Sequence, residues 1–434
     1  MSTTDAPRAR VRRASSEATK FHMSSRAVDR SVEEYASWSD KKCVKHLAMV
    51  RWGSAETMPC PHCSTCTRHY FYEADLRWKC KHCGSKFSVT SQTVFASRKM
   101  PYRKLLAALH LWACGAAGQP ALELRRMLQF KSYNTAFTLV SKLREGLIRG
   151  FNTGLISGVV EMDGAHASGR RASEKRGKPQ NYRSSEEVQE SEKQALLTTA
   201  ARQKKRREEK AAAIAAGGNV DPGTGQVFPE TRRLVFTLRR RSGAKGQGAI
   251  LTRVGVGLTE SPDVVEALAT TYVAIPESVL ATDTGTAFSK LGKRFQLHLQ
   301  VNHSETLSGP EGQHNNNAES FGARQDRSEK GVYLNIEPKY LLDYATETAF
   351  REDNRRRAPG AQADLALHHA LTVGESHFWR GYTHGKHRSY EMLATGNRNY
   401  PASGPPKGVP QMSVGVGRLP HEAAGRLGAR TFSI

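Results

Sequence analysis

Apolar positions recur at helical spacing between residues 98 and 150. The stretch "PYRKLLAALHLWACGA" starts with Pro101, and proline is typical of the first turn of a helix. Two further amphipathic segments follow, "QPALELRRML" and "NTAFTLVSKLREGLI", separated by the polar "QFKSY". The pattern predicts a helical unit over 98–150 that is helix-turn-helix-like, although two adjacent amphipathic helices also occur in many other domains.

Short runs of alternating apolar and polar positions begin near residue 158. The first predicted strand is "GVVEMDGAH", with Asp163 at its end. Further along, the segments are the strands "RRLVFTLRRR" and "AILTRVGVGL", the helix "SPDVVEALATTYV", the strands "ESVLATDTG" and "KRFQLHLQVNHS", and the helices "NNAESFGARQDR" and "EPKYLLDYATETAFREDNRR". This order predicts an α/β domain with a mixed sheet over 158–357.

The remaining segments are basic and lack this patterning. Residues 1–35 are predicted to be a flexible arm, and 167–230 a basic, partly helical or disordered insertion with "RRASEKRGK" and "RQKKRREEK". Residues 358–434 are rich in Gly, Pro and Arg and are predicted to be a loosely structured tail. Between arm and helical unit, 36–97 should hold a short helix followed by a cluster of cysteines.

The charge balance indicates a polyanionic partner. The chain has 65 Lys and Arg against 41 Asp and Glu, a formal charge of +24. Phosphate backbones favour such an excess through counterion release, although a ribosomal-type or merely soluble basic protein would share it. No apolar run reaches the roughly 18–20 residues that a membrane span needs, and the first residues lack the apolar core of a signal peptide. We therefore expect a soluble, intracellular protein with no membrane partner.

Two matched cysteine pairs predict a metal site. Cys60 and Cys63 form one Cys-x2-Cys pair, Cys80 and Cys83 form another, and sixteen residues separate the pairs. Two such pairs supply the four thiolates of a tetrahedral structural Zn²⁺ site, and the intervening strand-like segments make a zinc ribbon. Such a site stabilises the fold and leaves no coordination position open for catalysis. The nearby alternatives as ligands are Cys66, His62, His69 and His82.

The other cysteines are expected in the core. Cys43 and Cys114 lie on apolar faces of predicted helices, which favours core thiols over nucleophiles. The odd total of seven cysteines also argues against a disulfide framework.

Basic residues flank both the cysteine cluster and the helical unit. Those beside the cysteines are Arg68, Arg77, Lys79 and Lys81, and those beside the helices are Arg125, Arg126 and Lys131. Together they are candidates for contacts to DNA phosphates, although each alone could be a solvated surface charge.

Three acidic residues stand at matching places of the predicted α/β domain. Asp163 and Asp283 each end a strand, and Glu319 lies at the start of a helix. In ribonuclease-H-like domains three such carboxylates converge at one end of the sheet and hold divalent ions for phosphoryl transfer. The alternatives are local: the aspartates could cap turns, and Asn316 could be an N-cap with Glu319 completing a capping box.

The motifs together resemble a known family. They are "MPCPHC" and "WKCKHCGSKFSVTSQTVF" within 58–95, "VVEMDGAH", "LATDTGTAF", "VNHSE", and "HNNNAESFGARQDRSEKGVYLNIEPKYLLDYATETAFRED". Outside the insertion, residues of about 40–355 resemble a zinc-ribbon DDE transposase of bacterial insertion sequences, of the Merlin-related group. The resemblance implies a zinc ribbon followed by a ribonuclease-H-like catalytic domain.

The resemblance also implies cut-and-paste DNA transposition with Mg²⁺ or Mn²⁺. Water and then a freed 3′-hydroxyl would attack phosphodiesters in double-stranded DNA, at terminal inverted repeats and at the target. Asp163 and Asp283 would be the first two acids and Glu319 the third, with Asn316 as its rival, because some members use asparagine there. His303 would lie near the site and contact DNA.

Joining two DNA ends implies a homodimer or a larger assembly. The compartment would be the cytoplasm with its nucleoid in a bacterial host, or the nucleus in a eukaryotic one.

Two places depart from the family pattern. The first block often reads Asp-Glu followed by a pair of glycines, whereas this chain has Asp163-Gly164 and a single Gly169. Members usually carry Lys or Arg seven positions after the glutamate, where this chain has Asp326 followed by Arg327. The alternative function is therefore an inactive or domesticated DNA-binding protein derived from a transposase. A ribonuclease-H-like nuclease without strand transfer is a further alternative.

Overall fold

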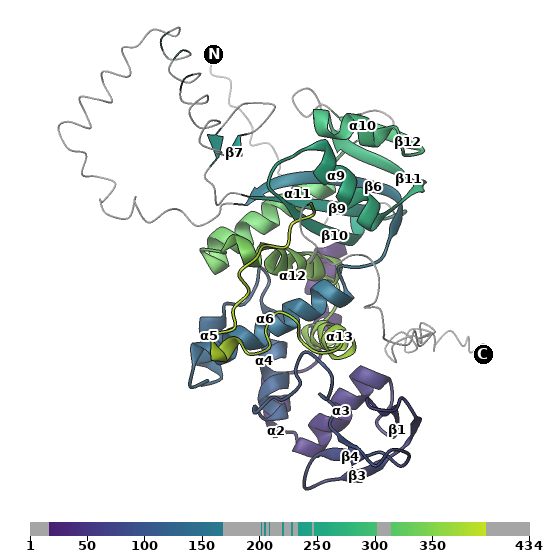
Figure 1. Cartoon of the computed structure of the whole chain (residues 1–434), viewed down its shortest axis with the longest axis vertical. Helices are drawn as coiled ribbons and strands as arrows, with labels where there is room; N and C mark the ends of the chain where they lie inside the picture. Colours follow the sequence, from purple (N-terminus) through teal and green to yellow (C-terminus); the bar gives the residue numbers. More distant parts are fainter. Residues whose placement is uncertain are drawn as a thin grey trace, which may run out of the picture.

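The computed structural model describes residues 17–167, 201, 204, 208, 219–220, 227–228, 233–244, 247–301 and 314–395. The molecule is elongated, with a small cysteine-rich domain at one end, a large sheet at the other, and helices between them (Figure 1). Among the described residues, none of the helices combines the length and apolar character needed to cross a membrane.

The predicted mixed sheet is present and has five strands. In chain order they are β6 (Ile156–Ala167), β9 (Arg233–Arg241), β10 (Ala249–Gly257), β11 (Val273–Asp283) and β12 (Leu297–Val301). Their order across the sheet is β10-β9-β6-β11-β12. Strands β6, β9 and β10 pair antiparallel, whereas β11 runs parallel to both β6 and β12. The sheet therefore changes from antiparallel to parallel pairing at β6, its central strand.

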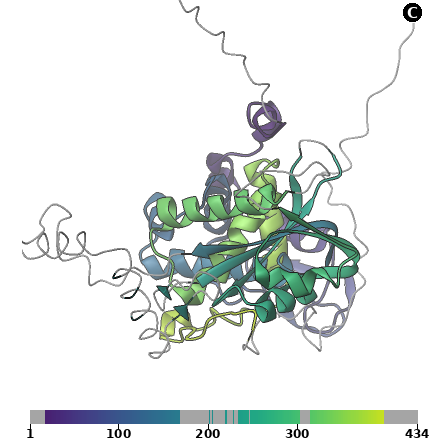
Figure 2. The ribbon, with the colours of Figure 1, turned by 90° about the horizontal axis from the view of Figure 1, so that it is seen from above.

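Helices cover both faces of this sheet (Figure 2). They are α9 (Pro262–Tyr272), α10 (Ser289–Gly292), α11 (Asn316–Arg327) and α12 (Leu341–Asp353). Two short 3-10 turns, η3 (Thr286–Phe288) and η5 (Pro338–Tyr340), and a π-helical segment, η4 (Ser328–Tyr333), lie between them. On one face Val160, Leu280 and Leu268 of α9 share a core. On the other face Val254 packs in a core with Phe321 of α11 and Phe350 of α12. The alternation of each strand thus divides its residues between two apolar layers.

The three predicted helices of the middle region are also present. They are α4 (Tyr102–Cys114), α5 (Ala121–Met127) and α6 (Tyr133–Gly150). Helices α4 and α6 pack on α12 and on α13 (Pro359–Thr372), in a hydrophobic core that also includes Phe350 and Leu367. The helical unit therefore shares its core with helices from the C-terminal half of the chain.

Part of the expected flexible arm is folded. It contains α1 (Glu17–His22), η1 (Ser25–Ala27) and α2 (Val32–Ser37). The Asp29 carboxylate accepts hydrogen bonds from the first amides of α13, those of Gly360 and Ala361, and Arg30 forms an ion pair with Asp364. The expectation of a flexible segment is therefore wrong for residues 17–35, while residues 1–16 lie outside the described residues.

The expected loose tail is wrong for residues 359–372, which form α13. Its residues Ala363, Ala366, Leu367 and Ala370 are buried between α3, α4 and α6. A short turn, η6 (Tyr382–His384), follows, and residues 396–434 lie outside the described part. Of the predicted insertion, the described residues include Ala167, three isolated positions and the short hairpin β7 (Asn219–Val220) and β8 (Val227–Phe228).

The cysteine-rich domain follows helix α3 (Asp40–Trp52), whose N-cap Ser39 accepts a hydrogen bond from the Lys42 amide. Its strands are β1 (Thr57–Pro59), β2 (Cys66–Arg68), β3 (Tyr70–Tyr72), β4 (Arg77–Lys79) and β5 (Lys86–Phe87). β1 pairs with β2, and β3, β4 and β5 form an antiparallel sheet. These are the hairpins expected of a zinc ribbon.

Candidate active site and metal centre

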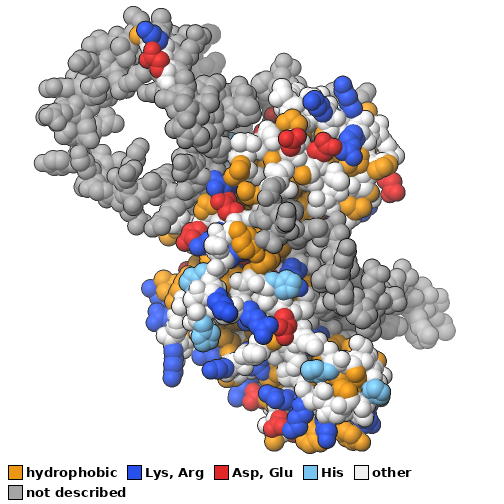
Figure 3. Space-filling model, viewed as in Figure 1, with side chains coloured by type: hydrophobic (Ala, Val, Ile, Leu, Met, Phe, Trp, Pro, Cys, Tyr) orange, Lys and Arg blue, Asp and Glu red, His pale blue; other side chains and the backbone are white. Residues whose placement is uncertain are grey.

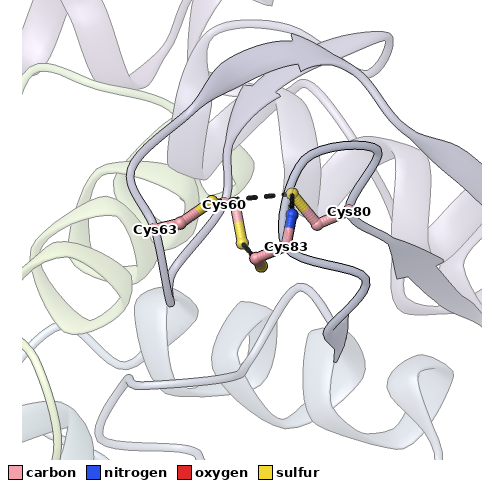
Figure 4. Close-up of side chains that lie close together, drawn as sticks. All are labelled: Cys60, Cys63, Cys80 and Cys83. Carbon is pink, nitrogen blue, oxygen red and sulfur yellow. Dashed lines mark hydrogen bonds between the residues drawn. The ribbon is translucent and has the colours of Figure 1, made fainter.

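The four predicted cysteines come together. The Sγ atoms of Cys60, Cys63, Cys80 and Cys83 lie within 4.8 Å of one another. Cys60 Sγ lies 3.8 Å from Cys83 Sγ, and Cys63 Sγ lies 3.6 Å from Cys80 Sγ (Figure 4). A tetrahedron of sulfurs with Zn–S distances of about 2.3 Å has edges of about 3.8 Å. The cluster therefore has the dimensions of a structural zinc site.

Two similar turns present the cysteines. In the first, the Cys60 amide donates to the Thr65 carbonyl, and in the second the Cys80 amide donates to the Ser85 carbonyl. Gly84 closes the second turn with a φ of 71°, a left-handed conformation that glycine adopts without strain. The amides of His62 and His82 point at the Cys60 and Cys80 sulfurs at 3.4 Å, which favours thiolates.

Side-chain hydroxyl groups lower the pKa of two of the thiols. The Thr65 hydroxyl lies 3.4 Å from Cys63 Sγ and lowers the pKa of that thiol to about 5. A hydrogen bond with Ser85 likewise lowers the pKa of Cys83, whereas burial raises the pKa of Cys60. Since zinc binds thiolates, these interactions prepare part of the site for the metal.

The alternative ligands lie outside the cluster. Cys66 is exposed on β2. His69 is buried, with Nε2 at 3.1 Å from the Met58 carbonyl and Nδ1 accepting from the Lys81 amide, so it supports the ribbon instead. Cys43 is buried as expected, but Cys114 is exposed, so its assignment as a core thiol is wrong.

The two candidate aspartates lie at the same level of the large sheet. Ala281 of β11 pairs with Glu161 of β6, and Asp283 and Asp163 each come two residues later. Asp283 ends β11 as predicted. Asp163 lies inside β6, because the strand continues to Ala167 along β9, so the prediction of a strand end there is wrong.

Alternation along the strands directs both aspartates to the face that α11 covers. Val160 and Met162 belong to the core under α9, whereas Glu161 contacts α11. Because side chains alternate, Asp163 follows Glu161 onto the α11 face, and Asp283 shares it. Each carboxylate also accepts a hydrogen bond from the following amide, at 2.9 Å for Gly164 and 2.6 Å for Thr284.

Helix α11 carries Glu319 in its first turn and lies along β6. Asn315 Nδ2 donates to the Met162 carbonyl at 3.3 Å, and a Cβ on Gly322 would stand 3.0 Å from that of Ala165. The seven steps from residue 315 to residue 322 rise about 10 Å in a helix, and the three steps from 162 to 165 span about 10 Å in a strand. Glu319, midway along this stretch and exposed, is therefore level with Asp163.

The carboxylates do not form a closed cluster. Within the described part of the chain, the cysteine group is the only place where three or more His, Cys, Asp or Glu ligand atoms approach within 4.8 Å of one another. Asp163, Asp283 and Glu319 instead come from adjoining elements and border one face of the sheet. Their oxygens are hard ligands of the kind that Mg²⁺ and Mn²⁺ prefer.

The asparagines before Glu319 have separate positions. Helix α11 starts at Asn316, so the predicted N-cap at Asn316 is wrong, and Asn315 occupies the cap without a side-chain capping bond. Asn316 is exposed one turn before Glu319, while Asn317 points its amide at Glu161.

A buried glutamate that the sequence reasoning missed caps α11 from the sheet. Glu161 Oε2 accepts from the amides of Asn317 and Ala318 at 2.8 and 3.1 Å. Its Oε1 accepts from Asn317 Nδ2 at 2.7 Å and from Arg241 Nε at 2.6 Å. His314 Nδ1 lies 3.3 Å from the same oxygen, and burial, together with Arg241, lowers the pKa of His314. The signal in the sequence was a charged residue inside the apolar run "VVEM".

The predicted DNA-contacting cations are mostly on the surface. Arg77, Lys79 and Lys81 are exposed on the ribbon, and Arg126 is exposed at the end of α5, with Arg125 half-buried beside it. Arg327 is exposed at the end of α11 with its Nε donating to the Ala323 carbonyl. His303 lies outside the described residues.

Comparison with protein families agrees with this arrangement. Residues 38–86 match a transposase zinc-ribbon domain and residues 219–353 match an ISXO2-like transposase domain. The second match contains Asp283, Asn316 and Glu319, while Asp163 precedes it. No curated protein and no solved structure matches the chain. The chain therefore joins a transposase zinc ribbon to an ISXO2-like transposase domain, the two parts of a zinc-ribbon DDE transposase.

Proposed function

We propose that the protein cleaves the ends of a DNA element and transfers the strands to a target, using divalent metal ions. The observation that carries this proposal is the placement of Asp163, Asp283 and Glu319 on one face of the sheet of a chain with a transposase domain. The strand order β10-β9-β6-β11-β12, with three antiparallel strands followed by two parallel ones, supports a ribonuclease-H-like fold.

The three carboxylates would hold Mg²⁺ or Mn²⁺. When bound, the metal supplies positive charge that activates the attacking oxygen and stabilises the charge on the phosphodiester. Asp163 and Asp283 approach from neighbouring strands and Glu319 from the helix above them.

Glu161 would act as a positioning residue for Glu319. Its carboxylate joins β6, which carries Asp163, to the first amides of α11, which carries Glu319. A carboxylate at a helix N-terminus also opposes the positive end of the helix dipole. Asp163 lies on β6, and the helix that carries Glu319 is anchored to the same strand at Glu161, two residues earlier.

The surrounding cations would hold double-stranded DNA. The ribbon residues Arg77, Lys79 and Lys81 and the helical-unit residues Arg125 and Arg126 would contact phosphates, which orient DNA without reading its sequence. We propose His303 and Arg327 as contacts nearer the acids. Joining two ends further implies a homodimer or larger assembly, working at the nucleoid of a bacterial host or in the nucleus of a eukaryotic one.

A second candidate, a DNA-binding protein without cleavage, is favoured by Asp326. Asp326 occupies the position where the family usually has a cation, and it forms an ion pair with Lys330 at 2.5 Å. The acidic charge is therefore partly neutralised, and Arg327 adds a cation at the next position.

The test is Mg²⁺- or Mn²⁺-dependent cleavage of DNA that carries the element's own ends. We expect Asp163→Asn, Asp283→Asn and Glu319→Gln each to reduce cleavage at least 100-fold while DNA binding remains within about twofold. The matched control is Glu266→Gln on α9, a half-exposed glutamate paired with Arg294, which should cleave normally.

Asn316→Ala separates the two candidates for the third ligand. Loss of cleavage in this variant but not in Glu319→Gln would move the ligand to Asn316. Binding without cleavage by the unmodified protein would favour the second candidate, and cleavage without strand joining would indicate a nuclease.

A further inference from the structure

The β3-β4-β5 sheet of the zinc ribbon has two different faces. On one face Phe71, Trp78 and Phe87 pack together, and Trp52 of α3 lies against Trp78 with ring centroids 5.7 Å apart. This face is closed by the core that continues into the helices. The opposite face is open to solvent at every position of the three strands that points that way.

The open face carries two aromatic rings among cations. Tyr70 and Tyr72 are 58% and 43% exposed. Across the strands Tyr70 pairs with Lys79 and Tyr72 with Arg77, and Lys79 pairs in turn with Lys86. Because paired residues of antiparallel strands point the same way, these five side chains form one surface, the ribbon platform.

Cations lie over both rings. The Lys81 ammonium group is 5.1 Å from the centroid of Tyr70, and that of Lys86 is 5.2 Å from the centroid of Tyr72. The nearby acids lie in the turn between β3 and β4 and are paired: Glu73 with Lys41 and Asp75 with Lys86. Positive charge and exposed aromatic surface therefore coincide, as the adjoining blue and orange side chains at the ribbon end of Figure 3 illustrate.

We propose that the ribbon platform binds an unpaired DNA strand, stacking bases on Tyr70 and Tyr72 while Arg77 and Lys79 hold its phosphates. Surfaces that bind single strands combine these same two features, aromatic rings for bases and cations for the backbone. Duplex DNA would use the cations alone, because its bases are paired and covered.

The spacing of the tyrosines also favours an unpaired strand. Side chains two residues apart on one strand are separated by about 7 Å, whereas stacked bases of a duplex are about 3.4 Å apart. Two rings at this separation can each receive one base only if the bases have come apart from each other. A single strand permits this at little cost, and a duplex does not.

This site goes beyond the proposed function, because it needs neither divalent metal nor cleavage. The test uses the full-length, zinc-loaded protein without Mg²⁺ and measures binding to fluorescently labelled oligothymidylate by anisotropy, with a duplex of equal length in parallel. We expect Tyr70→Ala/Tyr72→Ala to weaken single-strand binding at least tenfold and duplex binding less than twofold. Tyr70→Phe/Tyr72→Phe keeps both rings and should bind both DNAs normally.

Salt dependence separates stacking from phosphate binding. For single strands the slope of log affinity against log salt becomes shallower by about 0.7 when a substitution removes the cation that binds one phosphate. Lys79→Ala should reduce the slope by about this amount, whereas the tyrosine variant should leave the slope unchanged and lower affinity at every salt concentration. Zinc content of each variant, measured by metal analysis, confirms that the ribbon is intact.

Two results would overturn the proposal: equal weakening of single-strand and duplex binding in the alanine variant, or no weakening of either. Oligouridylate binding more than tenfold tighter than oligothymidylate would overturn the assignment to DNA. Glu266→Gln should bind oligothymidylate normally. Because this binding is measured without Mg²⁺, failure of cleavage and failure of this platform are observed in separate experiments.

Discussion

At the scale of single residues, the site depends on a buried charge. The Glu161 side chain is fully shielded from solvent, yet its oxygens accept hydrogen bonds from two backbone amides, an asparagine amide and a guanidinium group. A buried carboxylate is stable only with such complete pairing. The same hydrogen bonds fix the start of α11 relative to Asp163.

Glu161→Gln tests this role. We expect the free energy of unfolding to fall by about 3 kcal/mol, because Arg241 and two amides lose a charged acceptor in a buried place. Glu266→Gln, at an exposed ion pair, should cost less than about 1 kcal/mol. Urea unfolding measures both. If Glu161→Gln is as stable as the unmodified protein, the carboxylate does not anchor the helix.

A positioning role for Glu161 has its own readout. Displacing Glu319 should raise the Mn²⁺ concentration needed for half-maximal DNA cleavage more than it lowers the rate at saturating metal. A purely structural role would lower the amount of active protein and leave that concentration unchanged.

At the scale of elements, α13 joins the N-terminal and C-terminal parts of the chain. It packs on α3, α4 and α6, so closely at Gly150 that an added Cβ would lie 3.0 Å from His369 Nδ1. His369 also packs edge-on against the rings of Phe151 and Phe350, which contact each other. Burial, followed by the proximity of His368 and Arg253, lowers the pKa of His369 to about 4.

The lowered pKa of His369 predicts a pH-dependent stability. In the unfolded chain a histidine takes up a proton near pH 6.5, whereas folded His369 does so only near pH 4, so acid favours unfolding between these values. The destabilisation is about 1.4 kcal/mol per pH unit, or roughly 2 kcal/mol between pH 7 and 5. His369→Phe should remove this part of the dependence, measured by urea unfolding at both pH values.

The exposed His384 of η6 provides the control. His384→Phe should leave the change of unfolding free energy between pH 7 and 5 as it is in the unmodified protein. If the unfolding free energy of His369→Phe changes between pH 7 and 5 by as much as that of the unmodified protein, the prediction is wrong. His369 is then already protonated in the folded state at pH 5.

At the scale of the whole molecule, two hydrophobic cores divide the described residues. One runs from the zinc ribbon through α4 and α6 to α12 and includes Met58, Trp78 and Phe350. The other lies between the sheet and α9 and includes Val160, Phe236 and Leu268. The ribbon and the sheet with the candidate active site lie at opposite ends of the molecule (Figure 1), and the first core extends from the ribbon to the face of the sheet that α11 covers.

Zinc removal should unfold the ribbon end of the molecule first. Structural zinc contributes about 10–16 kcal/mol in isolated zinc-finger peptides, far more than the small strands β1–β5 can supply by packing. We expect chelation to abolish hydrogen-exchange protection in β1–β5 while β6 and β11 stay protected, and Cys60→Ser to behave like the chelated protein. Protection of the ribbon without zinc, or simultaneous unfolding of β6, would contradict this division.

Much of this arrangement could be predicted because it depends on short-range patterns. Two Cys-x2-Cys pairs specified the ligands that come together, since each pair is a local turn. The order of strands and helices followed from the spacing of apolar residues, which recur every two positions in strands and every 3.6 in helices. This order predicted the mixed sheet. Asp163, Asp283 and Glu319 were predicted as site residues from their places in that order. The continuation of the strand past Asp163 was missed, because only pairing with β9 extends it.

The remaining features were decided by the tertiary structure, because they join residues far apart in the chain. Glu161 caps a helix more than 150 residues away, which no local capping motif reveals. Residues 359–372 are structured because α3, α4 and α6 bury their small apolar side chains, and residues 17–35 because Asp29 and Arg30 contact α13. Sequence by itself determined the elements, the zinc ligands and the positive charge. Long-range burial and charge pairing determined which segments are ordered and how α11 is held against the sheet, since both depend on partners that only folding brings near.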